Sequence, residues 1–298
     1  MELVRDQTAL RTASLTAIAL VAFAANSLLC RLALGDERID AASYTSLRLL
    51  SGAATLWAIV AFSGRSNHVP EGGGWVSAAM LFLYAVAFSF AYLTLDAGTG
   101  ALILVGAVQV TMILAGFFEG HRPYALEWLG LVSAFGGLVY LVSPGISAPA
   151  PFGAMLMAVA GIAWGIYSLR GRRSGDPVVA TAANFVRAVP FALVVSLVAL
   201  TDFEITTRGA WLAVLSGAVA SGMGYVIWYA ALKGLTTMRA AIVQLAFPVL
   251  AAIGGVLFLS EDVTYRLVIS SVVILGGIAL AIWGRDYAAR ISVETSSG

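Results

Sequence analysis

Long apolar segments alternate with short polar segments along the whole chain. Charges, prolines and glycines delimit ten apolar segments, at residues 12–34, 41–63, 74–95, 99–118, 126–142, 152–169, 178–200, 210–232, 238–259 and 263–283. A helix needs about 20 apolar residues to cross the hydrocarbon core of a bilayer. Strands of an outer-membrane barrel are instead about 10 residues long and alternate in polarity. The pattern therefore predicts an all-α polytopic membrane protein with ten transmembrane helices.

The composition of the chain supports this prediction. Of its 298 residues, 60% are hydrophobic and 11% are charged, whereas soluble domains are roughly 45–50% apolar and 25% charged. Ten spans of about 20 residues would leave loops too short for a separate folded domain. An ordinary cytoplasmic enzyme, a secreted disulfide scaffold and a disordered chain are thereby excluded. The net charge of +1 does not favour a nucleic-acid partner.

Arginine and lysine are unevenly distributed between the polar segments. If the N-terminus is cytoplasmic, eleven of the 17 basic residues fall in cytoplasmic segments. Four others, Arg31, Arg38, Arg208 and Arg266, fall in external loops. Short cytoplasmic loops of membrane proteins carry an excess of basic residues. We therefore expect both termini in the cytoplasm.

The two halves of the chain share features at an offset of about 137–140 residues. The matched segments are 46–48 with 185–187, 75–92 with 211–229, 101–103 with 241–243 and 136–138 with 276–278. We therefore expect two five-helix repeats, residues 1–145 and residues 146–298, the second ending in a short cytoplasmic tail. Because five is odd, the second repeat enters the membrane from the opposite side. Inverted repeats are typical of alternating-access transporters, with the substrate site near the midplane between the repeats.

The second half carries a recognisable signature. The tract Tyr229-Ala230-Ala231-Leu232, followed by Ala240-Ala241, Pro248, Ser260-Glu261 and Gly276-Gly277, resembles the EamA-type signature of the drug/metabolite transporter superfamily. The first half is similar in a degraded form, with Tyr92, Ala101 and Gly136-Gly137, and with His121 in place of Glu261. Within the superfamily the chain resembles the YddG-like exporters of the bacterial inner (plasma) membrane.

This resemblance implies a function and a cavity. The YddG-like exporters carry aromatic and other neutral amino acids, and the family is also linked to efflux of toxic cations such as methyl viologen. The resemblance implies that spans 1, 3 and 4 of the first half and spans 6, 8 and 9 of the second line a central cavity. It also implies a small-molecule substrate and a lipid bilayer as the partners, with the oligomeric state left open.

No carboxylate falls in the middle of a predicted span. Asp96, Glu119 and Glu127 come closest, at span boundaries. Carriers driven by protons or sodium usually hold an ionisable group at that depth. The sequence therefore favours export of amino acids without strong ion coupling, and a proton-coupled pump for drugs or toxic cations is the alternative.

Motifs for other chemistry are missing from the sequence. There is no phosphate-binding loop and no His-Glu-x-x-His motif. The single cysteine, Cys30, excludes an internal disulfide and a cysteine-based metal site. We therefore expect no enzymatic activity, no cofactor and no metal.

Two arginines, Arg48 and Arg187, fall within spans at matched positions of the two halves. A guanidinium is the natural partner of a substrate carboxylate. It can also hold a span end by binding carbonyl oxygens or by extending to the interface. We favour the structural interpretation, because an exporter of neutral amino acids and cations should not keep two bare positive charges in its cavity.

Amide and aromatic residues within the spans are the candidates for substrate contact. Tyr84, Phe88 and Tyr92 are four residues apart and so share one helix face. Aromatic rings attract both other rings and organic cations, although an aromatic stripe or a buried amide also serves helix packing. The residues that we expect to contact substrate are Asn26, Tyr84, Phe88, Tyr92, Gln109, Trp164, Tyr167, Tyr225, Trp228 and Gln244.

Glycine and proline residues in the spans suggest positions for motion. Gly161, Gly165 and Gly222 belong to patterns of small residues that let helices approach closely or slide. Pro248 lies near the middle of the ninth span, where it removes a backbone hydrogen bond. We expect these four residues to act as hinge or gating positions. The first-half counterpart of Pro248 is Val108, so bending there would be asymmetric.

Overall fold

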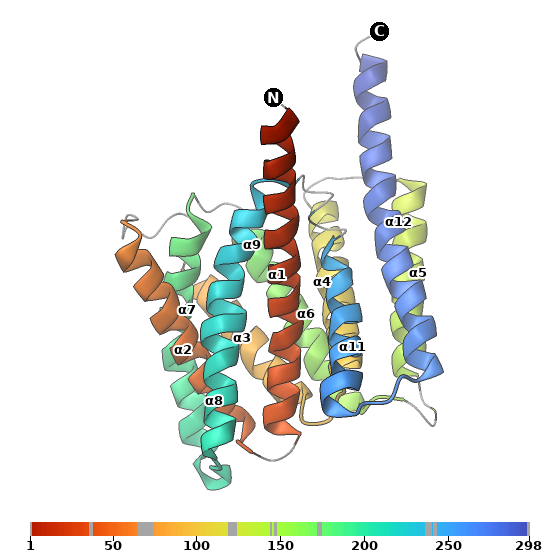
Figure 1. Ribbon diagram of the computed structural model, residues 1–298. Helices are drawn as coiled ribbons and strands as arrows, with labels where there is room; N and C mark the ends of the chain where they lie inside the picture. Colours follow the sequence, from red (N-terminus) through yellow and green to blue (C-terminus); the bar gives the residue numbers. More distant parts are fainter. Residues whose placement is uncertain are drawn as a thin grey trace.

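The chain folds into a bundle of helices in the computed structural model (Figure 1). The structure describes residues 2–35, 38–64, 74–118, 124–143, 145, 148–171, 175–235, 240 and 243–296. In chain order the elements are α1 (Glu2–Leu34), α2 (Ala41–Phe62), α3 (Trp75–Ala91), α4 (Ala97–Phe118), α5 (Ala125–Val142), α6 (Pro151–Gly171), α7 (Pro177–Val198), the short η1 (Leu200–Asp202), α8 (Thr207–Leu215), the π-helix η2 (Ser216–Met223), α9 (Gly224–Leu232), α11 (Ala246–Leu259) and α12 (Tyr265–Ser296).

The helices coincide with the ten predicted spans. By length and composition, eight stretches of the described residues can cross a membrane, and one of them, Thr207–Leu232, runs through α8, η2 and α9. The two other apolar helices, α3 and α11, are shorter, with 17 and 14 residues. The prediction of an all-α membrane protein with ten membrane helices is confirmed.

Several helices begin at a residue that favours helix initiation. Asp40 accepts a hydrogen bond from the backbone N–H of Ser43 at the start of α2 (2.8 Å), and Thr206 accepts one from Gly209 at the start of α8 (3.1 Å). Such side chains satisfy N–H groups that the first turn leaves unpaired. The backbone N–H of Asp40 also donates to the carbonyl of Glu204 (2.9 Å). The link before α2 is thereby fixed to the link before α8.

Both termini lie at the same end of the bundle, where α1 begins and α12 ends (Figure 1). Helices α2 and α7 form one flank and α5 and α12 form the other, with the remaining helices between them. Corresponding helices of the two halves make corresponding contacts. Helix α1 of the first half packs on α11 and α9 of the second half, and its counterpart α6 of the second half packs on α4 and α3 of the first half. An inverted repeat of five spans predicts this correspondence.

A close helix contact explains the double glycine in each half. A Cβ atom at Gly277 of α12 would lie 2.6 Å from the carbonyl oxygen of Gly130 on α5. A Cβ atom at Gly137 of α5 would lie 2.8 Å from a side chain of α12. Cβ atoms at Gly136 and Gly276 would meet nothing within 4 Å. One glycine of each pair is therefore needed for the contact between the two helices.

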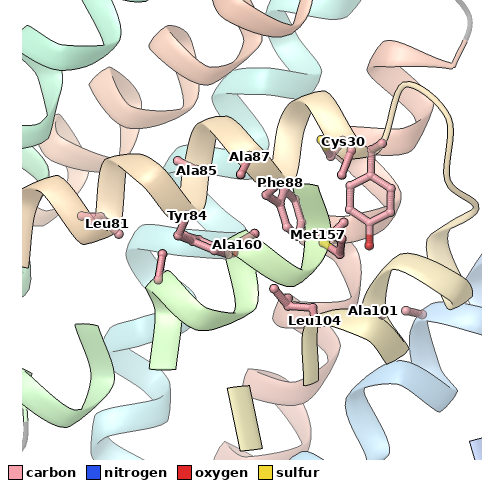
Figure 2. Packing of buried hydrophobic residues seen from close by; sticks show 14 of the residues in the cluster. Cys30, Leu81, Tyr84, Ala85, Ala87, Phe88, Ala101, Leu104, Met157 and Ala160 are labelled. Atoms are coloured by element: carbon pink, nitrogen blue, oxygen red, sulfur yellow. The ribbon is translucent and has the colours of Figure 1, made fainter. Parts of the chain in front are cut away.

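The core between α3 and α6 lies beside the predicted site residues. Figure 2 shows Tyr84 and Phe88 of α3 close to Met157 and Ala160 of α6. All four side chains are buried. The small Ala160 leaves room for an aromatic ring on the facing helix, so α3 and α6 pack closely with two large rings between them.

The ninth predicted span is not one continuous helix. Helix α11 begins at Ala246, after a turn at Leu245. Pro248 therefore lies in the first turn of α11, and not near the middle of a helix as we predicted. Proline is tolerated there because an N–H group in the first turn needs no helical partner. Val108, its counterpart in the first half, lies within the continuous helix α4.

The eighth span contains the π-helix η2, eight residues long, between α8 and α9. The sequence did not predict this change of helix type. A π-helical segment has wider turns than an α-helix and frequently marks a functional position. In this chain it changes the direction in which the serines of the span point relative to a continuous α-helix.

Candidate functional site

A cavity of about 860 Å³ lies in the centre of the bundle, within the range of roughly 300–1,000 Å³ for small-molecule sites. Its walls come mainly from α1, α3, α4, α6, α9 and the start of the ninth span, up to Phe247 in α11, and so from the six spans that the resemblance implied. The lining extends to Gly171, Pro177 and Leu235, at the end of the bundle that carries both termini (Figure 1). Toward the opposite end it stops at Ser27 on α1 and Leu104 on α4. The cavity therefore extends to the end of the bundle that carries both termini and stops short of the other end.

Nine of the ten predicted contact residues line this cavity. They are Asn26, Tyr84, Phe88, Gln109, Trp164, Tyr167, Tyr225, Trp228 and Gln244. The tenth, Tyr92, is fully buried just after α3, and its hydroxyl donates to the carbonyl of Ala97 (3.3 Å). Tyr92 thus belongs to the closed end of the bundle. Substrate contact by the other nine stays a prediction.

Aromatic rings from both halves of the chain form a continuous wall around the cavity. The ring centre of Trp164 on α6 lies 4.8 Å from that of Tyr84 on α3 and 5.3 Å from that of Tyr225 on α9. Phe23 on α1 continues the wall, with its ring centre 5.9 Å from those of Tyr225 and Trp228. We had not predicted Phe23. The wall offers ring faces and edges to an apolar or aromatic group.

The three predicted amides also line the cavity. Asn26 is 6% exposed, and its side-chain oxygen accepts a hydrogen bond from the hydroxyl of Ser216 in η2 (2.6 Å). This bond ties α1 to η2, which is the packing use of a buried amide. Gln109 on α4 and Gln244, just before α11, contribute one amide from each half of the chain to the lining of this cavity.

A buried guanidinium lies behind the aromatic wall. Arg48 on α2 is 2% exposed. Its Nη2 donates to the hydroxyl of Tyr84 (3.0 Å), and its Nε donates to the hydroxyl of Ser221 in η2 (3.4 Å). The guanidinium carbon lies 5.2 Å from the ring centre of Tyr84 and 4.9 Å from that of Phe88. Its Nη1 has no hydrogen-bond partner, and no described residue forms an ion pair with it.

These contacts differ from the structural role that we favoured for Arg48. That role requires carbonyl partners or a path to the membrane surface. Arg48 instead donates to two hydroxyl groups whose residues line the cavity. Arg187, its counterpart on α7, is partly buried and does not line the cavity. The Nη1 of Arg187 is also buried without a hydrogen-bond partner in the described part of the chain, so the two matched arginines differ in that only Arg48 donates to residues that line the cavity.

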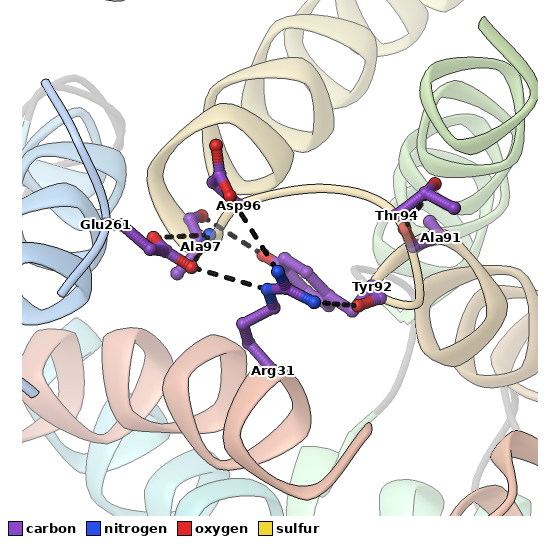
Figure 3. A network of polar contacts seen from close by, with 7 residues as sticks. All are labelled: Arg31, Ala91, Tyr92, Thr94, Asp96, Ala97 and Glu261. Carbon is purple, nitrogen blue, oxygen red and sulfur yellow. Dashed lines mark hydrogen bonds and ion pairs between the residues drawn. The ribbon is translucent and has the colours of Figure 1, made fainter. Parts of the chain in front are cut away.

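A polar network closes the bundle at the end opposite the termini (Figure 3). The guanidinium of Arg31 lies 3.5 Å from a carboxylate oxygen of Glu261 and 3.9 Å from one of Asp96. Its Nη1 donates to the carbonyl of Tyr92 (3.3 Å). The backbone N–H of Ala97 donates to both oxygens of Glu261 (3.0 and 2.9 Å). The network joins α1, the link between α3 and α4, and the link between α11 and α12.

Glu261 is the central group of this network. Its side chain is 10% exposed, and this burial raises the pKa of the carboxyl above its ordinary value. The hydrogen bond from Ala97 lowers the pKa, Asp96 raises it, and Arg31 lowers it, so the net shift is upward. We had quoted Glu261 only as part of the family signature and had not predicted it as a site residue.

Two of the three predicted hinge glycines, Gly161 and Gly165, lie at a close contact between α6 and α4. A Cβ atom at Gly161 of α6 would lie 2.6 Å from that of Ala107 on α4, and one at Gly165 would lie 2.9 Å from the side chain of Thr111. Gly222 lies inside the π-helix η2, where an added Cβ atom would come no closer than 3.3 Å to a neighbouring atom. The close contacts of Gly161 and Gly165 explain those two glycines as packing residues. Motion at the three glycines, and at Pro248, stays a prediction.

Several polar residues at or near the cavity were missed by the sequence analysis, among them Ser27, Tyr44, Ser216 and Ser221. Tyr44 lies four residues before Arg48 on α2, so the two share a helix face, and this spacing was the available signal. Serines in a span resemble ordinary packing residues until a partner is known. Among the described residues, no group of three or more His, Cys, Asp or Glu could hold a metal ion.

Comparison with known proteins identifies the family. Residues 151–283, from α6 into α12, match the EamA-like transporter family. A protein of Pseudomonas aeruginosa, named uncharacterized protein PA1977, is 52% identical over 91% of this chain and 94% of its own length. The chain belongs to the EamA-like transporter family. The matched residues fall in the second half, where the signature was complete.

This EamA-like transporter is a multi-pass membrane protein of the drug/metabolite transporter superfamily, and the family is one of transporters and not of enzymes. It is also similar to the threonine/homoserine exporter RhtA of Salmonella typhimurium, with 32% identity over 53% of this chain and 55% of RhtA. One solved crystal structure resembles it with a TM-score of 0.62 and 22% identity, covering 92% of this chain and 99% of that chain. That likeness concerns the fold alone.

Proposed function

We propose that this EamA-like transporter exports amino acids, both aromatic ones and other neutral ones such as threonine or methionine, from the bacterial cytoplasm. The observation that carries the proposal is the aromatic wall. Rings from both halves surround a cavity of about 860 Å³ that is open at one end of the bundle. Such a wall binds aromatic side chains through ring contacts and accepts aliphatic ones through apolar contact.

The open end and the closed end of the bundle suggest the order of steps in the transport cycle. With both termini in the cytoplasm, the cavity is open to the cytoplasm and the Arg31–Glu261 network faces outward. This is the state that receives substrate from inside the cell. The two repeats, residues 1–145 and 146–298, then move relative to each other so that the network opens and the cytoplasmic end closes. The corresponding helix contacts of the two halves support such a pair of repeats.

The charges around the cavity support transport without strong ion coupling. Among the described lining residues, the only carboxylate belongs to Glu127. Glu127 lies in the first turn of α5, near the open end, where it accepts a hydrogen bond from the backbone N–H of Tyr124 (2.8 Å). The absence of a titratable acid deeper in the described lining favours movement of substrate down its own gradient.

The similarity to RhtA also supports export of small polar amino acids. RhtA is named as an exporter of threonine and homoserine. Both substrates carry the ammonium and carboxylate groups that aromatic amino acids carry, so one cavity can serve both if it binds those groups and tolerates different side chains. The amides of Gln109 and Gln244 supply hydrogen-bonding groups in that cavity.

Efflux from proteoliposomes tests the proposal. The purified protein is reconstituted, and loss of labelled phenylalanine, threonine and methionine is measured with and without an imposed pH gradient. We expect saturable efflux that the gradient does not change. Efflux that follows the gradient would instead indicate ion coupling. Absence of amino-acid efflux would contradict the proposal and leave the efflux of drugs or toxic cations as the better account.

A further inference from the structure

We propose that the hydroxyl groups of Tyr84 and Ser221 form a carboxylate-binding subsite in the part of the cavity that lies away from its open end. Arg48 is the positioning residue behind them, and its positive charge makes the subsite selective for anions. The inference rests on the proposed function, because it supplies a place for the carboxylate of an amino acid. It narrows the substrate class to molecules that carry a carboxylate, and it disfavours organic cations that lack one.

The direction of the hydrogen bonds is the first argument. Arg48 donates to the oxygen atoms of both Tyr84 and Ser221. A hydroxyl that accepts from a guanidinium still has its own proton to donate. Both residues line the cavity, and neither hydroxyl donates to another residue in the described part of the chain. Two donors are therefore available to a ligand at the same place.

The missing negative charge is the second argument. A guanidinium has five N–H donors, and only two of those of Arg48 have partners among the described residues. A buried charge without a partner is strongly unfavourable inside a membrane protein and usually marks a functional site. Ser27, which lines the cavity, and Tyr44, one turn before Arg48, also have buried oxygens without a partner. A bound carboxylate supplies the negative charge that this region lacks.

The aromatic rings determine whether a ligand in the cavity can contact the guanidinium of Arg48 directly. The rings of Tyr84 and Phe88 lie beside the guanidinium and keep Arg48 2% exposed. Tyr84 and Ser221 line the cavity and Arg48 does not, so the carboxylate contacts the two hydroxyl groups and not the guanidinium itself. A direct bidentate pair with arginine binds strongly and would slow release of the substrate. Binding through hydroxyl groups is weaker, which suits a carrier that must release its substrate on the other side.

The π-helix is needed for this arrangement. Ser221 lies in η2 and reaches Arg48 on α2, while Ser216 of the same segment reaches Asn26 on α1. Ser216 and Ser221 are five residues apart, which is the spacing of the backbone hydrogen bond of a π-helix, i to i+5, and not of an α-helix. One segment therefore contributes hydroxyl groups to both neighbouring helices of the first half.

Competition with two analogues of phenylalanine tests the subsite. The first, 3-phenylpropionate, keeps the ring and the carboxylate, and the second, phenethylamine, keeps the ring and the ammonium. Each competes with efflux of labelled phenylalanine from proteoliposomes. We expect 3-phenylpropionate to compete with the wild-type protein about tenfold better than phenethylamine. The ratio of the concentrations at which the two analogues half-inhibit phenylalanine efflux reports on the subsite. Substituting Arg48 would not change that ratio if its role were purely structural.

The variants separate the charge from the hydroxyl groups. We expect Arg48→Gln to abolish the preference for 3-phenylpropionate and Arg48→Lys to restore part of it, since lysine keeps the charge without the planar fork. Tyr84→Phe and Ser221→Ala should each raise the half-saturating concentration of phenylalanine by about tenfold, with a smaller change in maximal rate. Arg187→Gln is the matched control, because it removes the same charge from the paired span, and it should keep the wild-type ratio.

The outcomes distinguish this inference from the proposed function. If the wild-type protein exports phenylalanine but shows no preference between the competitors, the subsite is wrong and the exporter stands. The same conclusion follows if Tyr84→Phe, Ser221→Ala and a folded Arg48→Gln all keep the preference. If the wild-type protein exports no amino acid, the proposed function fails. Thermal stabilisation of the purified protein by 3-phenylpropionate, which requires no transport, then decides the subsite by itself.

Discussion

At the scale of single residues, the contact between α5 and α12 depends on one glycine of each pair. A Cβ atom at Gly277 would lie 2.6 Å from the carbonyl oxygen of Gly130, whereas one at Gly276 would meet nothing. We expect Gly277→Ala to lower the free energy of unfolding by about 1–3 kcal/mol, because the two backbones must separate. Gly276→Ala is the matched control and should change it by less than about 0.5 kcal/mol. Thermal unfolding in detergent measures both, and equal losses would contradict the explanation.

Helical spacing predicted which residue types line the cavity but not the surroundings of each residue. Tyr84 and Phe88 are four residues apart and both line the cavity. Tyr92 continues the spacing, but α3 ends at Ala91, so its side chain enters the closed end. The setting of Arg48 depends on a π-helix in another span. No local pattern around Arg48 contains that information, because it arises from packing between the halves.

At the scale of elements, the closed end is a junction of α1 with two links that depends on the contacts of Glu261. Cys30, the only cysteine of the chain, is buried beside Arg31, so its modification by N-ethylmaleimide reports on opening of this end. We expect Glu261→Gln to speed this labelling by roughly fivefold, because the amide nitrogen of glutamine cannot accept the hydrogen bond that the second carboxylate oxygen accepts from Ala97, a loss of about 1 kcal/mol. Glu204→Gln makes the same chemical change at an exposed position of the same end and should have no effect. An unchanged rate in Glu261→Gln would show that the contacts of Glu261 do not hold this end closed.

The raised pKa of the Glu261 carboxyl group predicts how the free energy of unfolding depends on pH. Burial raises the pKa of Glu261 in the folded protein, so the folded protein binds this proton more readily than the unfolded chain. The stabilising contribution is present at low pH and is lost as the pH rises through the raised pKa. The charged groups near Glu261 are Arg31 and Asp96, with Asp262 next to it in the same link.

Melting temperatures of the wild-type protein and of Glu261→Gln measure this effect. We expect the wild-type value to rise relative to that of the variant as the pH falls from about 7 to about 4.5. Because the glutamine does not titrate, other carboxyl groups cancel in the comparison. A difference that stays constant over this interval, or that changes in the opposite direction, would contradict the upward shift of the pKa.

At the scale of the whole molecule, the spans could be predicted from sequence because the bilayer imposes their length and the charge of their links. The basic residues expected outside, such as Arg31 and Arg266, indeed lie at the end opposite the termini. Which end of the cavity is open could not be predicted. One sequence specifies both states of an alternating-access carrier, and the two differ by only a few kcal/mol. Hydrophobic patterning is the same in both.

Alternating access requires the closed end to open, and a disulfide between the two halves can prevent this. A Cβ atom at Gly255 of α11 would lie 3.6 Å from that of Ala97 at the start of α4, within the roughly 3.5–4.5 Å that a disulfide requires. In a Cys30→Ala background, we expect Ala97→Cys with Gly255→Cys to lose phenylalanine efflux on oxidation and to regain it on reduction. Each single variant is a control, since a side chain at Gly255 also meets Glu261. Undiminished efflux with the disulfide fully formed would mean that substrate leaves without separation of α4 from α11.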